Sequence, residues 1–154
     1  MRMKTVFALS ASVAILFFSS AARSAESGVM AIAPSEMKWN AQGGLALPGL
    51  EQVTLIGDPS KPGPYTIRLK FPAGFKMAPH THPDSREVTV LSGTWYTGYG
   101  ETPEAAGLKE LPAGSFYTEP ANVAHYVEIR EPTVIQVSVT GPSGRKFVGP
   151  NAPK

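Results

Sequence analysis

Glycine and proline interrupt this chain along its whole length, and no other feature constrains its fold as much. There are 15 of each in 154 residues, and they are spread out rather than gathered in one linker. Both residue types start turns and end regular elements, so the segments between them are short. Many short segments without a sustained helical period are typical of an all-β protein with frequent turns.

Several of these segments have the composition of strands. The clearest is 65–71, in which Tyr, Ile, Leu and Phe alternate with Thr, Arg and Lys, the pattern of a half-buried strand. The predicted strands are 53–57, 65–71, 87–91, 94–99, 115–118, 125–130 and 133–140. Ser92 and Gly93 separate two of them and predict a hairpin turn, and ETPEAAGLKE predicts a polar connection with a helical turn. We therefore expect a sandwich or a small barrel.

The N-terminus has the three-part layout of a secretory signal peptide. Arg2 and Lys4 precede an apolar run over residues 6–18, and the small residues of SSAARSAES follow it. The run is short for a membrane-spanning helix, although an uncleaved N-terminal anchor is the alternative. Cleavage after Ala22 or after Ser24 satisfies the rule of small residues at the cleavage site. The sequence thus predicts a signal peptide over residues 1–24 and an exported protein, periplasmic or secreted, in a bacterium.

Removal of that signal changes the electrostatics of the chain. The full chain has a formal charge of +2, and the loss of Arg2, Lys4 and Arg23 brings it to −1. No basic run or aromatic-basic stripe remains to bind nucleic acid, so we expect no such partner. The chain also has no cysteine, so after export a hydrophobic core, with or without a metal, has to stabilise it.

The chain has only three histidines, and their placement suggests a metal site. His80 and His82 are two residues apart, so on an extended segment both side chains leave the same face. His125 starts an alternating strand far along the sequence. Imidazole is the commonest protein ligand for transition metals. A histidine pair in the proline-rich segment APHTHP is also compatible with a solvated loop, and His125 with a satisfied core position.

The spacing around these histidines resembles the two motifs of the cupin superfamily. The first motif is matched by GFKMAPHTHPDSREVTVLSG and the second by PAGSFYTEPANVAHY. The resemblance covers about residues 53–140. It implies a double-stranded β-helix, a jelly-roll barrel of two antiparallel sheets, with a divalent transition metal inside it. The implied ligands are His80, His82, Glu87 and His125. Beside the barrel we expect an N-terminal arm over residues 25–52 and a C-terminal tail over residues 141–154.

Glu87 departs from the family pattern by one residue. It stands one position too close to Gly93, and Arg86 occupies the position in which the glutamate usually lies. A shift of one residue reverses the face of the strand on which a side chain lies. A bulge near Ser85 and Arg86 would turn Glu87 inward. The alternative is a site of three histidines with open positions for water or substrate.

Two polar residues beside the motifs are expected to have backbone roles. Asp84 follows a proline and precedes a serine, which is turn chemistry. Asn122 stands where the family often has glycine, and asparagine tolerates the left-handed conformation.

A site of this kind is compatible with Fe, Mn, Ni, Cu or Zn. The resemblance implies a small metalloenzyme, a dioxygenase, isomerase or lyase, that acts on a small organic molecule. The alternative is a non-catalytic domain that binds or senses a small ligand and uses the metal structurally. The family resemblance also suggests a possible homodimer.

Overall fold

The computed structural model describes residues 30–41, 47–150 and 152. The signal peptide predicted for residues 1–24 lies outside them. The chain divides into a first unit, Met1–Ala31, and a second, Ile32–Lys154, and the fold described below is that of the second unit. Within the described ranges, no helix is both long enough and apolar enough to cross a membrane.

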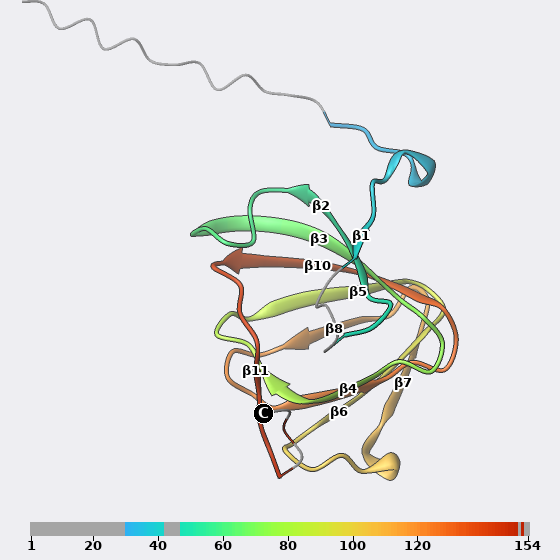
Figure 1. Ribbon diagram of the computed structural model, residues 1–154, viewed down its shortest axis with the longest axis vertical. Helices are drawn as coiled ribbons and strands as arrows, with labels where there is room; N and C mark the ends of the chain where they lie inside the picture. Colours follow the sequence, from blue (N-terminus) through green and yellow to red (C-terminus); the bar gives the residue numbers. More distant parts are fainter. Residues whose placement is uncertain (1–29, 42–46, 151, 153–154) are drawn as a thin grey trace, which may run out of the picture. The chain divides into compact units, whose positions relative to one another are not determined.

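The second unit consists of two antiparallel sheets, which confirms the all-β jelly-roll fold (Figure 1). The first sheet has the strand order β1-β2-β3-β10-β5-β8, with β1 Asn40–Ala41, β2 Glu51–Ile56, β3 Gly63–Phe71, β10 Thr133–Gly141, β5 Arg86–Ser92 and β8 Phe116–Glu119. The second has the order β11-β4-β9-β6-β7, with β11 Lys146–Phe147, β4 Lys76–Thr81, β9 His125–Glu128, β6 Thr94–Tyr99 and β7 Lys109–Pro112. Among the described residues there are also two 3-10 turns, η1 Pro34–Glu36 and η3 Ala105–Gly107.

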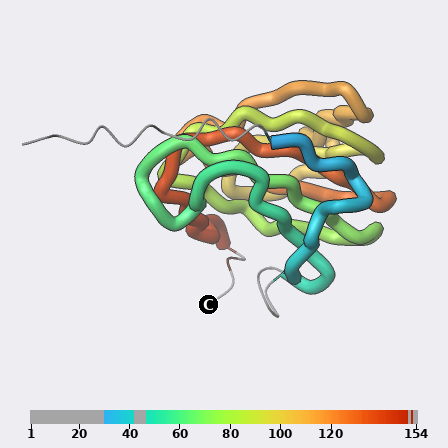
Figure 2. Tube along the Cα trace, turned by 90° about the horizontal axis from the view of Figure 1, so that it is seen from above, coloured from blue at the N-terminus to red at the C-terminus, as the bar shows by residue number. Residues whose placement is uncertain are grey.

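Strands that are distant in sequence form the middle of the first sheet. β10 pairs with β3 on one side and with β5 on the other. Both the ribbon and the view from above show β10 beside β3 (Figures 1 and 2). Because the backbone of a strand is pleated, its inward side chains alternate with outward ones, as in β5, where Val88 and Val90 are fully buried. This alternation fixes which residues face the interior.

Aromatic rings fill the interior at one end. Phe71 lies edge-on to Phe75, with ring centroids 5.1 Å apart, and edge-on to Trp95 at 5.0 Å. Edge-to-face pairs of this kind stabilise a core beyond the area they bury. The core therefore joins β3, the loop that follows it and β6, which belongs to the opposite sheet.

The hairpin predicted at Ser92 and Gly93 is wrong. β5 belongs to the first sheet and β6 to the second, so the chain passes from one sheet to the other at Gly93. Gly93 has φ 71°, and a Cβ at this position would lie 2.5 Å from the carbonyl oxygen of Pro132. Only glycine fits both the left-handed backbone and the close contact. The same local chemistry therefore forms a corner between sheets instead of a hairpin.

Residues on both sides of the predicted barrel contribute to it. Leu47 and Leu50, in the segment predicted as an arm, are buried in the core. In the segment predicted as a tail, β11 adds a strand to the edge of the second sheet by pairing with β4. Leu47, Leu50 and Gln52 of the first segment and Ser143, Gly144 and Arg145 of the second line one cavity.

Candidate metal centre

A local irregularity in β4 places the first two histidines inside the barrel. The pairing of β4 with β9 shifts between Met77 and His80. The side chains of Met77 and His80 therefore both face the interior, although the two residues are three positions apart. His82 follows two residues later and faces the same way. His80 and His82 are 2% and 4% exposed. The segment thus presents two imidazoles to the interior, as the sequence predicts from their spacing.

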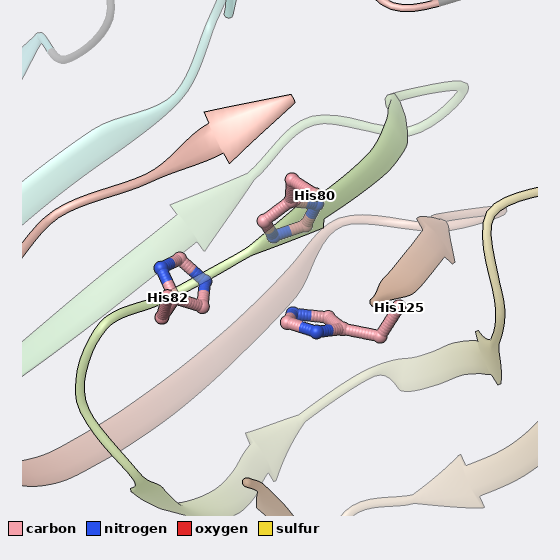
Figure 3. A group of neighbouring side chains, drawn as sticks. All are labelled: His80, His82 and His125. Carbon is pink, nitrogen blue, oxygen red and sulfur yellow. The ribbon is translucent and has the colours of Figure 1, made fainter. Parts of the chain in front are cut away.

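His125 lies directly opposite His80. The two residues are paired across β4 and β9, and their ring centroids are 4.2 Å apart. Asn122 holds the loop before β9, because its backbone N–H donates to the carbonyl oxygen of His82 at 2.8 Å. Its φ of 60° confirms the expected backbone role. One nitrogen from each of the three histidines lies within 4.8 Å of the others. Figure 3 shows the three rings pointing toward one another from β4, the segment after it and β9.

Backbone carbonyls set the orientation and the tautomer of all three rings. The Nδ1–O distances are 2.9 Å from His80 to Ala78, 2.5 Å from His82 to Gly144, and 3.1 Å from His125 to Val123. A carbonyl oxygen only accepts, so each Nδ1 carries the hydrogen and each Nε2 keeps a free lone pair. A hydrogen bond from the second ring nitrogen is the usual support of a metal-binding histidine.

The surroundings of His80 and His82 keep these two rings neutral. Burial lowers the pKa of His80 to about 2, and the nearby imidazole of His125 adds to this effect. Burial also lowers the pKa of His82 to about 3, followed in importance by the positive charge of Arg86. A neutral imidazole is the form that binds a metal ion.

The three histidines fit a divalent transition metal. Nε2 of His125 is fully buried and has no hydrogen-bond partner within the described part of the chain. An unsatisfied buried nitrogen is costly, and a metal ion shared with His80 and His82 would remove this cost. Three imidazole ligands with open positions are suited to Fe, Mn, Ni, Cu or Zn.

Glu87 does not join this cluster. The register between β5 and β8 is regular from Arg86 to Thr89, without the bulge that would have turned Glu87 inward. Arg86 is buried together with Val88, whereas Glu87 is exposed on the outer face of the sheet. Because neighbouring residues of a strand face opposite ways, the inward position belongs to the arginine. Glu87 therefore faces away from the three histidines.

A different carboxylate, missed in the sequence, lies beside the histidines. Glu119 is 6% exposed, and its carboxylate oxygens are 3.5 Å from Nε2 of His125 and 3.7 Å from Nε2 of His82. It is paired with Arg86 across β8 and β5. The sequence could have indicated Glu119 through its spacing from Tyr117. A strand extended to residue 119 places the side chains of Tyr117 and Glu119 on one face.

Tyr117 supports Glu119. Its hydroxyl donates to Oε1 of the carboxylate at 3.1 Å. Burial, and then the charge of Glu119, raises the pKa of Tyr117 well above its usual value, so the phenol stays protonated and keeps donating. The carboxylate is thereby held in place beside the histidines.

Arg86 links the metal-site segment to the loop between β10 and β11. Its Nε donates to Asp84 at 2.7 Å, and its Nη2 donates to the Ser143 hydroxyl at 2.9 Å and to the Gly144 carbonyl at 3.3 Å. That same Gly144 carbonyl accepts the hydrogen bond from His82. Asp84, which the sequence suggested as a turn residue, is the buried partner of this arginine. Arg86 therefore helps to position His82 through a shared acceptor.

The site opens into a cavity of about 260 Å³ between the two sheets. Its polar end is formed by His80, His82, Glu119, Arg86, Ser143, Gly144 and Arg145. Its remaining wall is largely apolar and includes Leu50, Ile67, Leu69, Met77, Ile135 and Val137. An apolar cavity with a few convergent polar groups is typical of a site for a small organic molecule.

Comparison with known families agrees with this architecture. The family model described as the ChrR cupin-like domain matches residues 27–144, which is most of the chain. The protein belongs to this cupin family. Among curated proteins, none matches this cupin in sequence. The homodimer suggested by the family resemblance stays a prediction.

Solved structures share the fold at low sequence identity. The polyketide cyclase RemF from Streptomyces resistomycificus has a TM-score of 0.64 and 14% identity, over 80% of this cupin and 89% of that chain. A putative acetylacetone dioxygenase from Methylibium petroleiphilum PM1 has a TM-score of 0.61 and 23% identity, over 82% of this cupin and 85% of that chain. A variant of salicylate 1,2-dioxygenase from Pseudoaminobacter salicylatoxidans, in complex with gentisate, has a TM-score of 0.54 and 14% identity, over 65% and 29%. These likenesses concern the fold.

Proposed function

We propose that this cupin is a small metal-dependent enzyme, of the oxygenase or oxidoreductase type, that acts on a small organic molecule. The observation that carries the proposal is the convergence of three buried, carbonyl-oriented imidazoles beside a largely apolar cavity. His80, His82 and His125 would hold the metal ion. When bound, the ion would supply a Lewis acid and a position for substrate or dioxygen.

The residues around the histidines have complementary roles. Glu119 is the carboxylate of the site, placed either to complete the metal shell or to accept a proton from a substrate in the cavity. Tyr117 keeps it oriented by its hydrogen bond. The apolar walls exclude water, which strengthens electrostatic interactions at the polar end. The reaction class is therefore one that needs a metal and a nearby base in a dry, small cavity.

Turnover by reconstituted protein tests this proposal. Purified protein would be loaded separately with Fe(II), Mn(II), Ni(II), Cu(II) and Zn(II), then assayed for oxygen uptake and product formation. The panel includes acetylacetone and gentisate, which the names of the Methylibium and Pseudoaminobacter structures suggest. We expect turnover with at least one combination of metal and substrate. This turnover should be lost in His80→Ala and retained in Glu87→Gln. Turnover that is equal in metal-free protein would contradict the proposal.

A non-catalytic domain with a structural metal is the second candidate. The ligands come from β4, the segment after it and β9, and His82 is hydrogen-bonded to the loop between β10 and β11, so a metal would join these parts of the chain. In this case a chelator lowers the melting temperature, while no compound of the panel is converted with any of the five metals. The enzyme proposal requires both effects, a lower melting temperature and loss of turnover.

We further propose that the protein is exported by the signal peptide expected over residues 1–24. The basic start, the apolar run and the small residues of its sequence support this proposal. Expression of the full chain in a bacterium should yield mature protein in the periplasm or the medium, starting at Arg23 or at Ala25. Intact-mass measurement of both fractions checks this, and uncleaved protein confined to the cytoplasm would overturn it.

A further inference from the structure

The two arginines of the cavity differ in how their charge is balanced. Arg86 is 8% exposed and forms an ion pair with Asp84 at 2.7 Å. Arg145 lines the same cavity but is exposed, and it has no carboxylate partner among the described residues. Its guanidinium lies over the ring of Phe147, 5.5 Å from the centroid. Arg145 thus adds to the cavity lining a positive charge that no carboxylate of the described residues contacts.

The loop that carries Arg145 is fixed against the histidines. The Gly144 carbonyl accepts hydrogen bonds from both His82 and Arg86, and the Ser143 hydroxyl accepts one from Arg86. The following strand, β11, pairs with β4, where Phe147 is opposite His80. A residue between two such anchors has little freedom to move away. The backbone of Arg145 is therefore anchored beside the candidate metal centre, and its positive charge acts on both His80 and His82.

The charges of the polar end do not cancel once a metal is bound. Asp84 pairs with Arg86, whereas Glu119 and Arg145 carry opposite charges without forming an ion pair, so that with the histidines counted as neutral the formal charges sum to zero before loading. A divalent ion adds two positive charges in a site largely screened from water. Burying that excess is unfavourable unless a ligand of opposite charge enters.

The shape of the cavity limits the rest of the ligand. A cavity of about 260 Å³ lies just below the ~300–1,000 Å³ usual for small-molecule pockets, so the ligand should be small. The wall away from the histidines consists mainly of aliphatic side chains such as Leu50, Ile67 and Ile135. The body of the ligand should therefore be apolar, with its polar atoms at one end.

We propose that the ligand of this cavity is a small organic oxyanion, a carboxylate or an enolate on an aromatic or branched aliphatic body, whose charged oxygens lie between the metal centre and Arg145. The inference rests on the proposed function, because it takes the metal-loaded cavity as the substrate site. It adds the substrate class and makes Arg145 the residue that selects for it. A planar guanidinium is well suited to a carboxylate, since it offers parallel donors.

Calorimetric binding to the zinc-loaded protein tests this inference without turnover. The probes are matched pairs of a carboxylate and its neutral amide, from acetate and acetamide through benzoate and benzamide to naphthoate and naphthamide. In the best pair we expect wild-type protein to bind the carboxylate at least about tenfold more tightly than the amide. Arg145→Gln should weaken carboxylate binding about 10- to 100-fold and leave amide binding unchanged, with part of the affinity restored in Arg145→Lys.

Arg130→Gln is the matched control, because Arg130 is an exposed arginine that pairs with Glu128 away from the cavity. Zinc content and melting temperature of each variant verify loading and folding. Equal binding of acid and amide, binding of neither in any pair, or carboxylate binding unchanged by Arg145→Gln would overturn the inference. The oxygen-uptake panel tests the proposed function separately. If a neutral compound is turned over and this turnover persists in Arg145→Gln, the metalloenzyme proposal holds and the proposal of an anionic substrate is rejected.

Discussion

Replacing Arg86 by methionine should lower the free energy of unfolding of the metal-free protein by about 3–5 kcal/mol. The change leaves the carboxylate of Asp84 buried without its cation, and Oδ1 of that carboxylate already has no hydrogen-bond partner among the described residues. It also removes the hydrogen bonds to Ser143 and Gly144. Urea unfolding in the presence of a chelator measures the effect without a contribution from metal.

Two variants separate the buried charge from the loss of packing. The double variant Asp84→Asn with Arg86→Met should recover much of the lost stability, because no uncompensated charge then remains. Arg130→Met breaks the exposed ion pair with Glu128 and should shift the urea midpoint far less, because solvent screens that pair. A loss in Arg86→Met as small as that in Arg130→Met would show that the pair with Asp84 contributes little.

Glu119→Gln should weaken metal binding about 10- to 100-fold, whereas Glu87→Gln should leave it unchanged. The carboxylate of Glu119 is 3.5 Å from Nε2 of His125, while Glu87 is exposed on the other face of its sheet. Both substitutions remove one charge and conserve the shape of the side chain, so each is the control for the other. Competition against a chelator of known affinity provides the measurement.

The reverse order of the two variants would contradict this assignment of the carboxylate. If Glu87→Gln lost metal and Glu119→Gln kept it, β5 would have to be shifted by one residue relative to its register here. Equal, undiminished binding in both would leave the three histidines as the complete protein ligand set.

The histidine cluster was predictable from the sequence because it depends on short-range geometry. His80 and His82 share a face of one extended segment, and the spacing around His125 resembles a known motif. The strands around them also follow from alternation, as in the segment that forms β3. For these residues, local pattern and final structure agree.

The carboxylate depends on information that the local pattern does not contain. Arg86 and Glu119 are opposite each other only because β5 pairs with β8, a contact between separate parts of the chain. The predicted strand ended at Thr118, one residue before the glutamate that faces the site. Gly93 is a similar case, because a glycine with positive φ is compatible with either a hairpin or a corner, and only the pairing of whole strands decides between them.

X-ray absorption at the metal edge of the purified, metal-loaded protein tests the central claim most directly. We expect one tightly bound metal ion per chain, with scattering from three imidazole rings and from oxygen ligands in the remaining positions. The imidazole signal should fall in His125→Ala and stay the same in Glu87→Gln. Protein that binds none of the five metals, or a bound ion whose shell lacks the three imidazoles, would contradict the account.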